Sequence, residues 1–170
     1  RNITVANGTE LNIGGALTLE GGTLTLGGST YLAVGDTVLI ADGASVSFSA
    51  SDTLVVSGNF TLSGNINFVD QGLTDNEDAV DDPTDALVIG GDLIINGAST
   101  FSPAGGSIVF ARNSGTRRVY NNTGRPLEFF KVELDDERTR SGVPHTVFPD
   151  GTIIKYTAIF SYGIWDGDLI

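Results

Sequence analysis

Apolar residues in the first 68 positions come in pairs, each pair separated by one residue, and the pairs follow a three-step rhythm. Successive pairs begin 8, 6 and 7 residues apart, and the next cycle repeats this with steps of 8, 6 and 8. These two cycles sum to 21 and 22 residues. Two apolar residues separated by one position point to the same side of a β-strand. The chain is therefore expected to form short strands that repeat in threes.

A three-step cycle predicts coils of three strands and three turns, stacked so that equivalent strands pair in parallel. The expected fold is a three-sided parallel β-helix, or β-solenoid, with coils of about 21–22 residues. Three interior ladders follow from the period: Ile3, Leu24, Val46 and Ile66; Leu11, Leu32 and Leu54; Leu17, Val38 and Phe60. A sandwich built from hairpins also uses short strands, but hairpin loops would not impose the three-step period.

The 23 glycines among 170 residues agree with this fold, because a corner every six to eight residues needs positive φ or close backbone approach. The chain contains no cysteine, which excludes disulfides, thiolate zinc sites and cysteine nucleophiles and fits an exported bacterial protein. The net charge of −12 argues against a nucleic-acid partner, since phosphates need cationic contacts. No apolar segment of 18 residues is present, so no membrane insertion is expected.

One domain, residues 1–170, is expected, with regular coils over 1–68 and an acidic loop excursion over 69–86. Residues 87–170 are expected to form less regular coils and the strands that cap or join them, beginning with the pairs Leu87/Ile89 and Leu93/Ile95. The excursion holds seven acidic residues and no basic one. Three interpretations are open: a solvated loop, a segment that pairs with the basic stretch of another molecule, or a calcium site, since Ca²⁺ takes six to eight oxygen ligands. The candidate ligands are Asp75, Glu77, Asp78, Asp81 and Asp82. No other cofactor is predicted.

The segments "GGSIVFARNSGTRRVYNNTGRPLEFFKVEL" and "TVFPDGTIIKYTAIFSYGIWDGDL" resemble repeat modules of large surface proteins exported by Bacteroidetes-type bacteria. The resemblance implies a right-handed β-helix in an adhesin or cell-surface appendage, outside the cell and without catalytic activity. The sequence "VPH" departs from the usual polar spacing of these modules.

Other polar features admit two interpretations each. Four arginines, Arg112, Arg117, Arg118 and Arg125, either cover an outer wall or contact anionic polysaccharide. His145 is the single histidine and Asp166/Asp168 the nearest carboxylate pair, and neither has the surroundings of a catalytic site, so no enzyme is predicted. The outward positions of the first wall are Asn2/Thr4, Thr23/Thr25, Ser45/Ser47 and Asn65/Asn67, and only one rung has the Thr-x-Thr form of ice-binding solenoids.

The functional expectation is an extracellular structural or adhesive solenoid on a bacterial surface. It would be a stalk segment flanked by similar modules or a subunit that stacks end to end with copies of itself into a filament, because both ends of the sequence enter apolar strands directly. A carbohydrate-binding or carbohydrate-active β-helix is the alternative, and an ice-binding solenoid is a more remote one. Surface polysaccharide is a further candidate partner.

Overall fold

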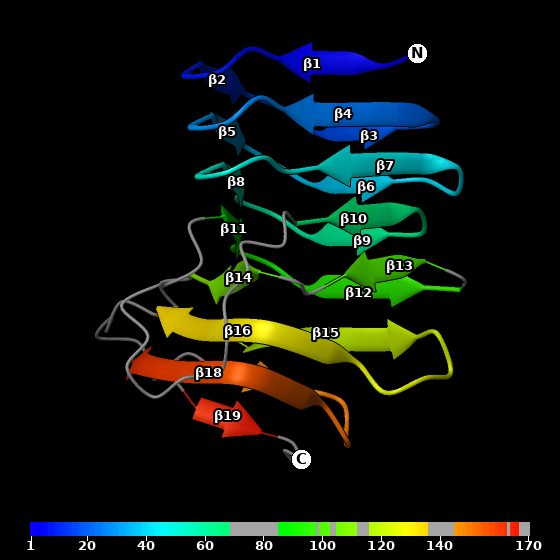
Figure 1. Ribbon diagram of the computed structural model, residues 1–170. Helices are drawn as coiled ribbons and strands as arrows, with labels where there is room; N and C mark the ends of the chain where they lie inside the picture. The colour runs from blue at the N-terminus through cyan, green and yellow to red at the C-terminus, as the bar shows by residue number, and fades with distance from the viewer. Residues whose placement is uncertain are drawn as a thin grey trace.

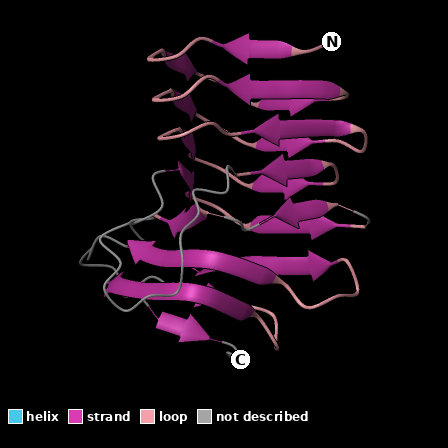
Figure 2. Ribbon diagram, viewed as in Figure 1, coloured by secondary structure: helices cyan, strands magenta, loops and turns pink. Residues whose placement is uncertain are grey.

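The computed structural model describes residues 1–68, 85–97, 99–102, 105–111, 116–135, 145–162 and 164–166. These residues form β-strands and no helix. The strands lie in three parallel sheets, and within each sheet they stack along one common axis (Figures 1 and 2). Within the described ranges there is accordingly no helix that could cross a membrane. The predicted β-solenoid is confirmed.

Each sheet takes one strand from each coil. Sheet A contains β1 (Ile3–Val5), β4 (Gly22–Leu26), β7 (Ala44–Ser47), β10 (Asn65–Asn67) and β13 (Thr100–Ser102). Sheet B contains β2 (Glu10–Ile13), β5 (Tyr31–Val34), β8 (Thr53–Val56), β11 (Asp85–Ile89), β14 (Gly106–Phe110), β16 (Glu128–Asp135) and β18 (Ile153–Tyr162). Sheet C contains β3 (Leu17–Leu19), β6 (Val38–Ile40), β9 (Phe60–Leu62), β12 (Leu93–Asn96), β15 (Thr116–Asn122), β17 (His145–Val147) and β19 (Ile164–Asp166).

The register between strands reproduces the ladders expected from the sequence. Leu32 pairs with Leu11 and with Leu54, and the same column continues through Leu87 to Ile108. The other two columns also continue past the acidic segment, from Ile66 to Phe101 and from Phe60 to Leu93. The repeat therefore resumes in register after residue 84.

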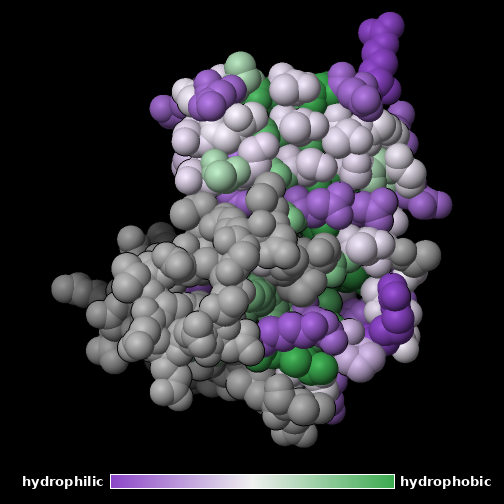
Figure 3. Space-filling view, viewed as in Figure 1, coloured by the Kyte–Doolittle hydropathy of each residue, from purple (hydrophilic) through white to green (hydrophobic). Residues whose placement is uncertain are grey.

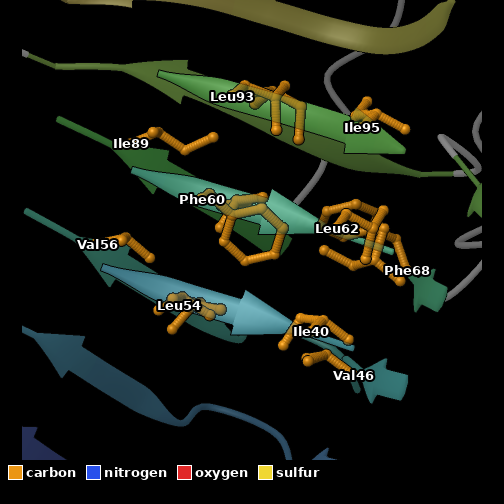
Figure 4. Packing of buried hydrophobic residues seen from close by; sticks show 14 of the residues in the cluster. Ile40, Val46, Leu54, Val56, Phe60, Leu62, Phe68, Ile89, Leu93 and Ile95 are labelled. Carbon is orange, nitrogen blue, oxygen red and sulfur yellow. The ribbon is translucent and has the colours of Figure 1, made fainter. Parts of the chain in front are cut away.

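The interior of the coils is filled by these columns of aliphatic and aromatic side chains (Figure 4). Leu54, Phe60 and Ile66 each have 0% of their surface exposed, one from each sheet of the solenoid. Burial of an aliphatic side chain of this size stabilises the fold by about 1.5–3 kcal/mol. Toward the C-terminal coils the filling becomes aromatic, and the rings of Phe101 and Phe129 meet edge to face with centroids 5.5 Å apart.

The extra residues of the acidic segment enter at one corner. Ile66 follows Val46 by 20 positions, whereas Leu87 follows Leu54 by 33, so the insertion lies between β10 and β11. Strand β11 begins at Asp85, which places the last two residues of the expected excursion, Asp85 and Ala86, in the sheet.

The C-terminal coils are less regular because sheet A ends earlier than the others. Within the described residues it stops at β13, and each later turn contains one strand of sheet B and one of sheet C. Strands β16 and β18 have 8 and 10 residues, against 4 or 5 in the sheet B strands before them. Figure 1 shows β16 running below β13 before it reaches sheet B. Its pairing with β18 shifts in register between Phe129 and Lys131, as at a β-bulge.

The close approach of two neighbouring coils explains why residue 64, at a corner of the solenoid, is a glycine. A Cβ atom on Gly64 would lie 2.1 Å from the carbonyl oxygen of Ala44 and 2.4 Å from that of Ala41, both backbone atoms. At Gly14, by contrast, an added Cβ would meet nothing within 4 Å.

We expect Gly64→Ala to destabilise the protein by about 1–3 kcal/mol, because the backbone of the adjacent turn must move to admit a methyl group. Gly14→Ala, the matched control, should change stability by less than about 1 kcal/mol. Urea denaturation followed by circular dichroism measures both. Equal midpoints for the two variants would contradict the close stacking of the corners.

Candidate functional site

The outer face of sheet A is a regular array of small, uncharged polar side chains. Thr23, Ser45 and Asn65 lie in one column, and the hydroxyls of Thr23 and Ser45 are 2.9 Å apart. The Asn65 Oδ1 atom accepts a hydrogen bond from the backbone N–H of Thr100, at 3.2 Å. Figure 3 shows mostly pale residues of intermediate hydropathy over the front of the upper coils. These side chains satisfy one another along the axis, as expected for a hydrogen-bonding ladder.

Sheet B presents a different surface. Its outward column of Ala33, Val55, Val88 and Val109 is apolar, and each of these side chains is partly exposed. Beside this column, Tyr31 is 42% exposed. No role for this column was predicted from the sequence. Its signal was present in the residues between the inward pairs, which are aliphatic in these strands.

Two buried aspartates connect successive coils at the corner between sheets A and B. The Asp52 carboxylate accepts hydrogen bonds from the backbone N–H groups of Thr30 and Ser49, at 2.8 and 2.6 Å. The N–H of Asp52 in turn donates to Asp85 Oδ1 at 3.0 Å. Both side chains have 0% exposure. Asp85 therefore has a structural contact in the sheet and is not part of the acidic loop expected from the sequence.

The predicted calcium ligands Asp75, Glu77, Asp78, Asp81 and Asp82 lie outside the described residues. Calcium binding there stays a prediction. Among the residues that are described, no three His, Asp or Glu side chains are grouped as metal ligands would be.

The arginines do not form one basic face. Arg117 is only 1% exposed, so its expected place on an outer wall is wrong. Its Nε donates to the Thr146 hydroxyl at 2.7 Å, its Nη2 donates to the Phe110 carbonyl at 3.2 Å, and the guanidinium lies 5.4 Å from the centre of the Phe110 ring. These polar and aromatic contacts make the inward position favourable for a guanidinium.

The other described arginines are exposed to solvent, unlike Arg117. Arg118 is exposed and its backbone N–H donates to Asp92 Oδ1 at 2.8 Å. Arg125 is also exposed, in the turn between β15 and β16, and Arg112 lies outside the described residues. A polysaccharide contact spread over all four arginines is therefore ruled out by the burial of Arg117.

The residues considered for catalysis are only partly placed. His145 begins β17, in register between Thr116 and Ile164, and Asp166 ends β19. Their side chains and the whole of Asp168 lie outside what is described. The absence of enzymatic activity stays a prediction.

The first coil exposes interior positions that are buried in the coil stacked on it. Ile3 is 52% exposed and Leu11 is 40% exposed, whereas their register partners Leu24 and Leu32 are 4% and 1% exposed. A hollow of about 570 Å³ lies at this end and is lined by Arg1, Ile3, Thr18, Leu19, Glu20, Gly21, Gly22 and Thr23. The outer edges of β1, β2 and β3 have no neighbouring strand in the described structure. This end has the geometry to receive another coil.

No family model, curated protein or solved structure matches this chain.

Proposed function

We propose that this chain is a stiff structural segment of an adhesive rod or stalk on the outer surface of a bacterium, joined end to end to further β-solenoid coils. The neighbouring coils belong to copies of the chain or to flanking modules of a longer protein. The solenoid fold supports a rod-like role, since each coil rests on the next through backbone pairing and a continuous core.

The observation that carries this proposal is the open first coil. Ile3 and Leu11 occupy core columns but are half exposed, and the strand edges beside them are free to pair. An additional parallel coil would bury both side chains and satisfy the backbone groups of β1, β2 and β3 at once. A coil of the same kind is the complementary partner, because its three strands would meet the three edges together.

The axial length of the structure also favours joining. Seven strands spaced by about 4.8 Å give sheets B and C an extent of about 30 Å. A rod that projects from a cell surface would need many such units. The lack of cysteine and the self-satisfied polar ladder on sheet A support an exported protein with a solvated outer wall.

To test this proposal, residues 24–45 are placed directly before Ile3, in place of Arg1 and Asn2. This segment is one complete coil and precedes Val46, the residue that shares a column with Ile3. We expect the added coil to dock, to protect the amide protons of β1, β2 and β3 from exchange, and to raise the urea midpoint of a single transition. A coil that stays unprotected would contradict the proposal.

The second arm asks whether copies of the chain join. Sedimentation and negative-stain electron microscopy over increasing concentration should show end-to-end association, and Ile3→Lys with Leu11→Lys should abolish it. Tyr31→Lys with Tyr120→Lys, which adds the same two charges at exposed outward positions, is the control and should leave association unchanged. A chain that docks the added coil but stays monomeric would assign the neighbouring coils to a longer protein.

A further inference from the structure

The early end of sheet A leaves a hollow beneath β13. The hollow has a volume of about 410 Å³, within the range of small-molecule sites in proteins. Its lining comes from the ends of β12 and β13 and from the turn that joins β15 to β16: Ile95, Ser99, Thr100, Phe101, Thr123, Arg125, Pro126, Leu127 and Glu128. In the earlier coils a strand of sheet A occupies this place.

The turn that borders the hollow is held in one conformation by its own hydrogen bonds. Asn121 Nδ2 donates to the Arg125 carbonyl at 2.6 Å, and the Thr123 hydroxyl donates to Asn121 Oδ1 at 2.7 Å. The Arg125 N–H donates to the Thr123 hydroxyl at 3.2 Å. A turn fixed in this way holds its side chains at the hollow before any ligand arrives, which lowers the entropic cost of binding.

The polar side chains of the hollow are incompletely satisfied. Only 3% of the Ser99 surface is exposed, and its hydroxyl has no hydrogen-bond partner in the described structure. A buried hydroxyl without a partner is destabilising, so Ser99 would gain a hydrogen bond from a ligand that brought a polar group within its reach. The exposed Arg125 reaches over the same place, where its Nη2 donates to the Ser99 carbonyl at 3.4 Å, near the limit of a hydrogen bond.

The floor of the hollow is apolar. Phe101 is partly exposed there, while Ile95 and Leu127 are buried beside it. At the mouth, the Glu128 carboxylate lies 2.5 Å from Lys155 Nζ, so its charge is already paired. Arg125 is then the cationic side chain among the lining residues that is open to an anion.

We propose that this hollow binds a sugar unit that carries a carboxylate. The apolar face of the sugar ring packs on Phe101, its carboxylate pairs with the Arg125 guanidinium, and a ring hydroxyl bonds to the buried Ser99 hydroxyl. This combination of an aromatic surface, a guanidinium and hydroxyl groups matches an acidic pyranose. The site is independent of the open first coil, so either proposal stands if the other fails.

A peptide strand added to β13 is the competing occupant, because no strand is hydrogen-bonded to the lower edge of β13 in the described structure. The sugar is favoured since Arg125 already contacts the Ser99 carbonyl just ahead of that edge, and a strand would have to displace it. A strand also gives no account of the unpartnered Ser99 hydroxyl.

The test is an NMR titration of the intact chain with matched sugars at millimolar concentration. Glucuronate is compared with glucose, and galacturonate with galactose, because each pair differs at the carboxylate alone. We expect at least one acidic sugar to saturate, to shift the amide signals of Ser99, Thr123 and Arg125, and to bind at least tenfold more tightly than its neutral counterpart. Absence of saturable binding by both acids would overturn the proposal.

Two variants locate the contacts. Arg125→Gln should weaken the acidic sugar at least tenfold, whereas Arg118→Gln, an exposed arginine outside the hollow, should not affect it. Ser99→Ala should weaken binding several-fold while leaving the fold intact or more stable. Neutral sugars that bind as well as acidic ones, with no effect of Arg125→Gln, would overturn recognition of the carboxylate. A peptide of residues 21–28 that protects the β13 amides would assign the hollow to strand addition instead.

Discussion

Leu54→Asp is expected to abolish cooperative folding. Leu54 has 0% exposure and stands in the sheet B column between Leu32 and Leu87, so an aspartate there would be surrounded by aliphatic side chains. Loss of a buried leucine alone costs about 2–5 kcal/mol. An unpaired carboxylate in the same place adds several kcal/mol of desolvation, or must bind a proton to avoid it. The sum approaches the whole stability of a typical domain, about 5–15 kcal/mol.

Val55→Asp, the next residue, is the matched control. Val55 points outward on the same strand and is partly exposed, so a carboxylate can remain hydrated there. Thermal and urea denaturation by circular dichroism should show a cooperative transition for this control and none for Leu54→Asp. If Leu54→Asp melted cooperatively near the wild-type midpoint, the inward assignment of the sheet B column would be wrong.

The three walls were predictable because one physical rule determines them. Parallel strands that stack in register require equivalent side chains at a constant spacing, and the pairs led by Leu11, Leu32 and Leu54 satisfy it. The prediction extended beyond the insertion for the same reason, since Leu87 returns to the same column. A hydrophobic period reports both the fold and its register, even when the chain between two repeats is lengthened.

Arg117 shows why charge alone misplaces a residue. It was assigned to an outer wall on chemical type, yet it precedes the inward Val119 by two positions and therefore faces the same side of β15. The alternation therefore predicts an inward side chain. Of the contacts that make this position favourable, Phe110 belongs to the preceding strand of the same coil and Thr146 to the next coil, 29 residues away. Such long-range compensation cannot be inferred from one strand.

The hollow beneath β13 was not predictable from the period. It exists because the chain passes from β15 to β16 without forming a sheet A strand, and the preceding repeat gives no sign of that omission. The open first coil was easier to anticipate, since the period places Ile3 and Leu11 in core columns. The proposed joining surface thus follows from the repeat, and the proposed sugar site follows from its interruption.

The second large loss of stability is expected from a substitution of a buried aspartate at the corner between sheets A and B. Asp52→Ala is expected to destabilise the protein by roughly 2–5 kcal/mol, because the backbone N–H groups of Thr30 and Ser49 would lose their shared acceptor. Thr30 itself is 1% exposed, which leaves water little access to its amide. The two amides belong to adjacent coils, so the loss should loosen the contact between coils as well as the local turn.

Asp42→Ala removes the same charge from an exposed position and should change stability by less than about 0.5 kcal/mol. This comparison separates the hydrogen bonds of Asp52 from the relief of charge repulsion in a chain of net charge −12. Asp52→Asn, which keeps one acceptor oxygen, should fall between the two. Hydrogen exchange should show faster opening at Thr30 and Ser49 in Asp52→Ala, and unchanged protection there would mean that the carboxylate does not hold the two coils together.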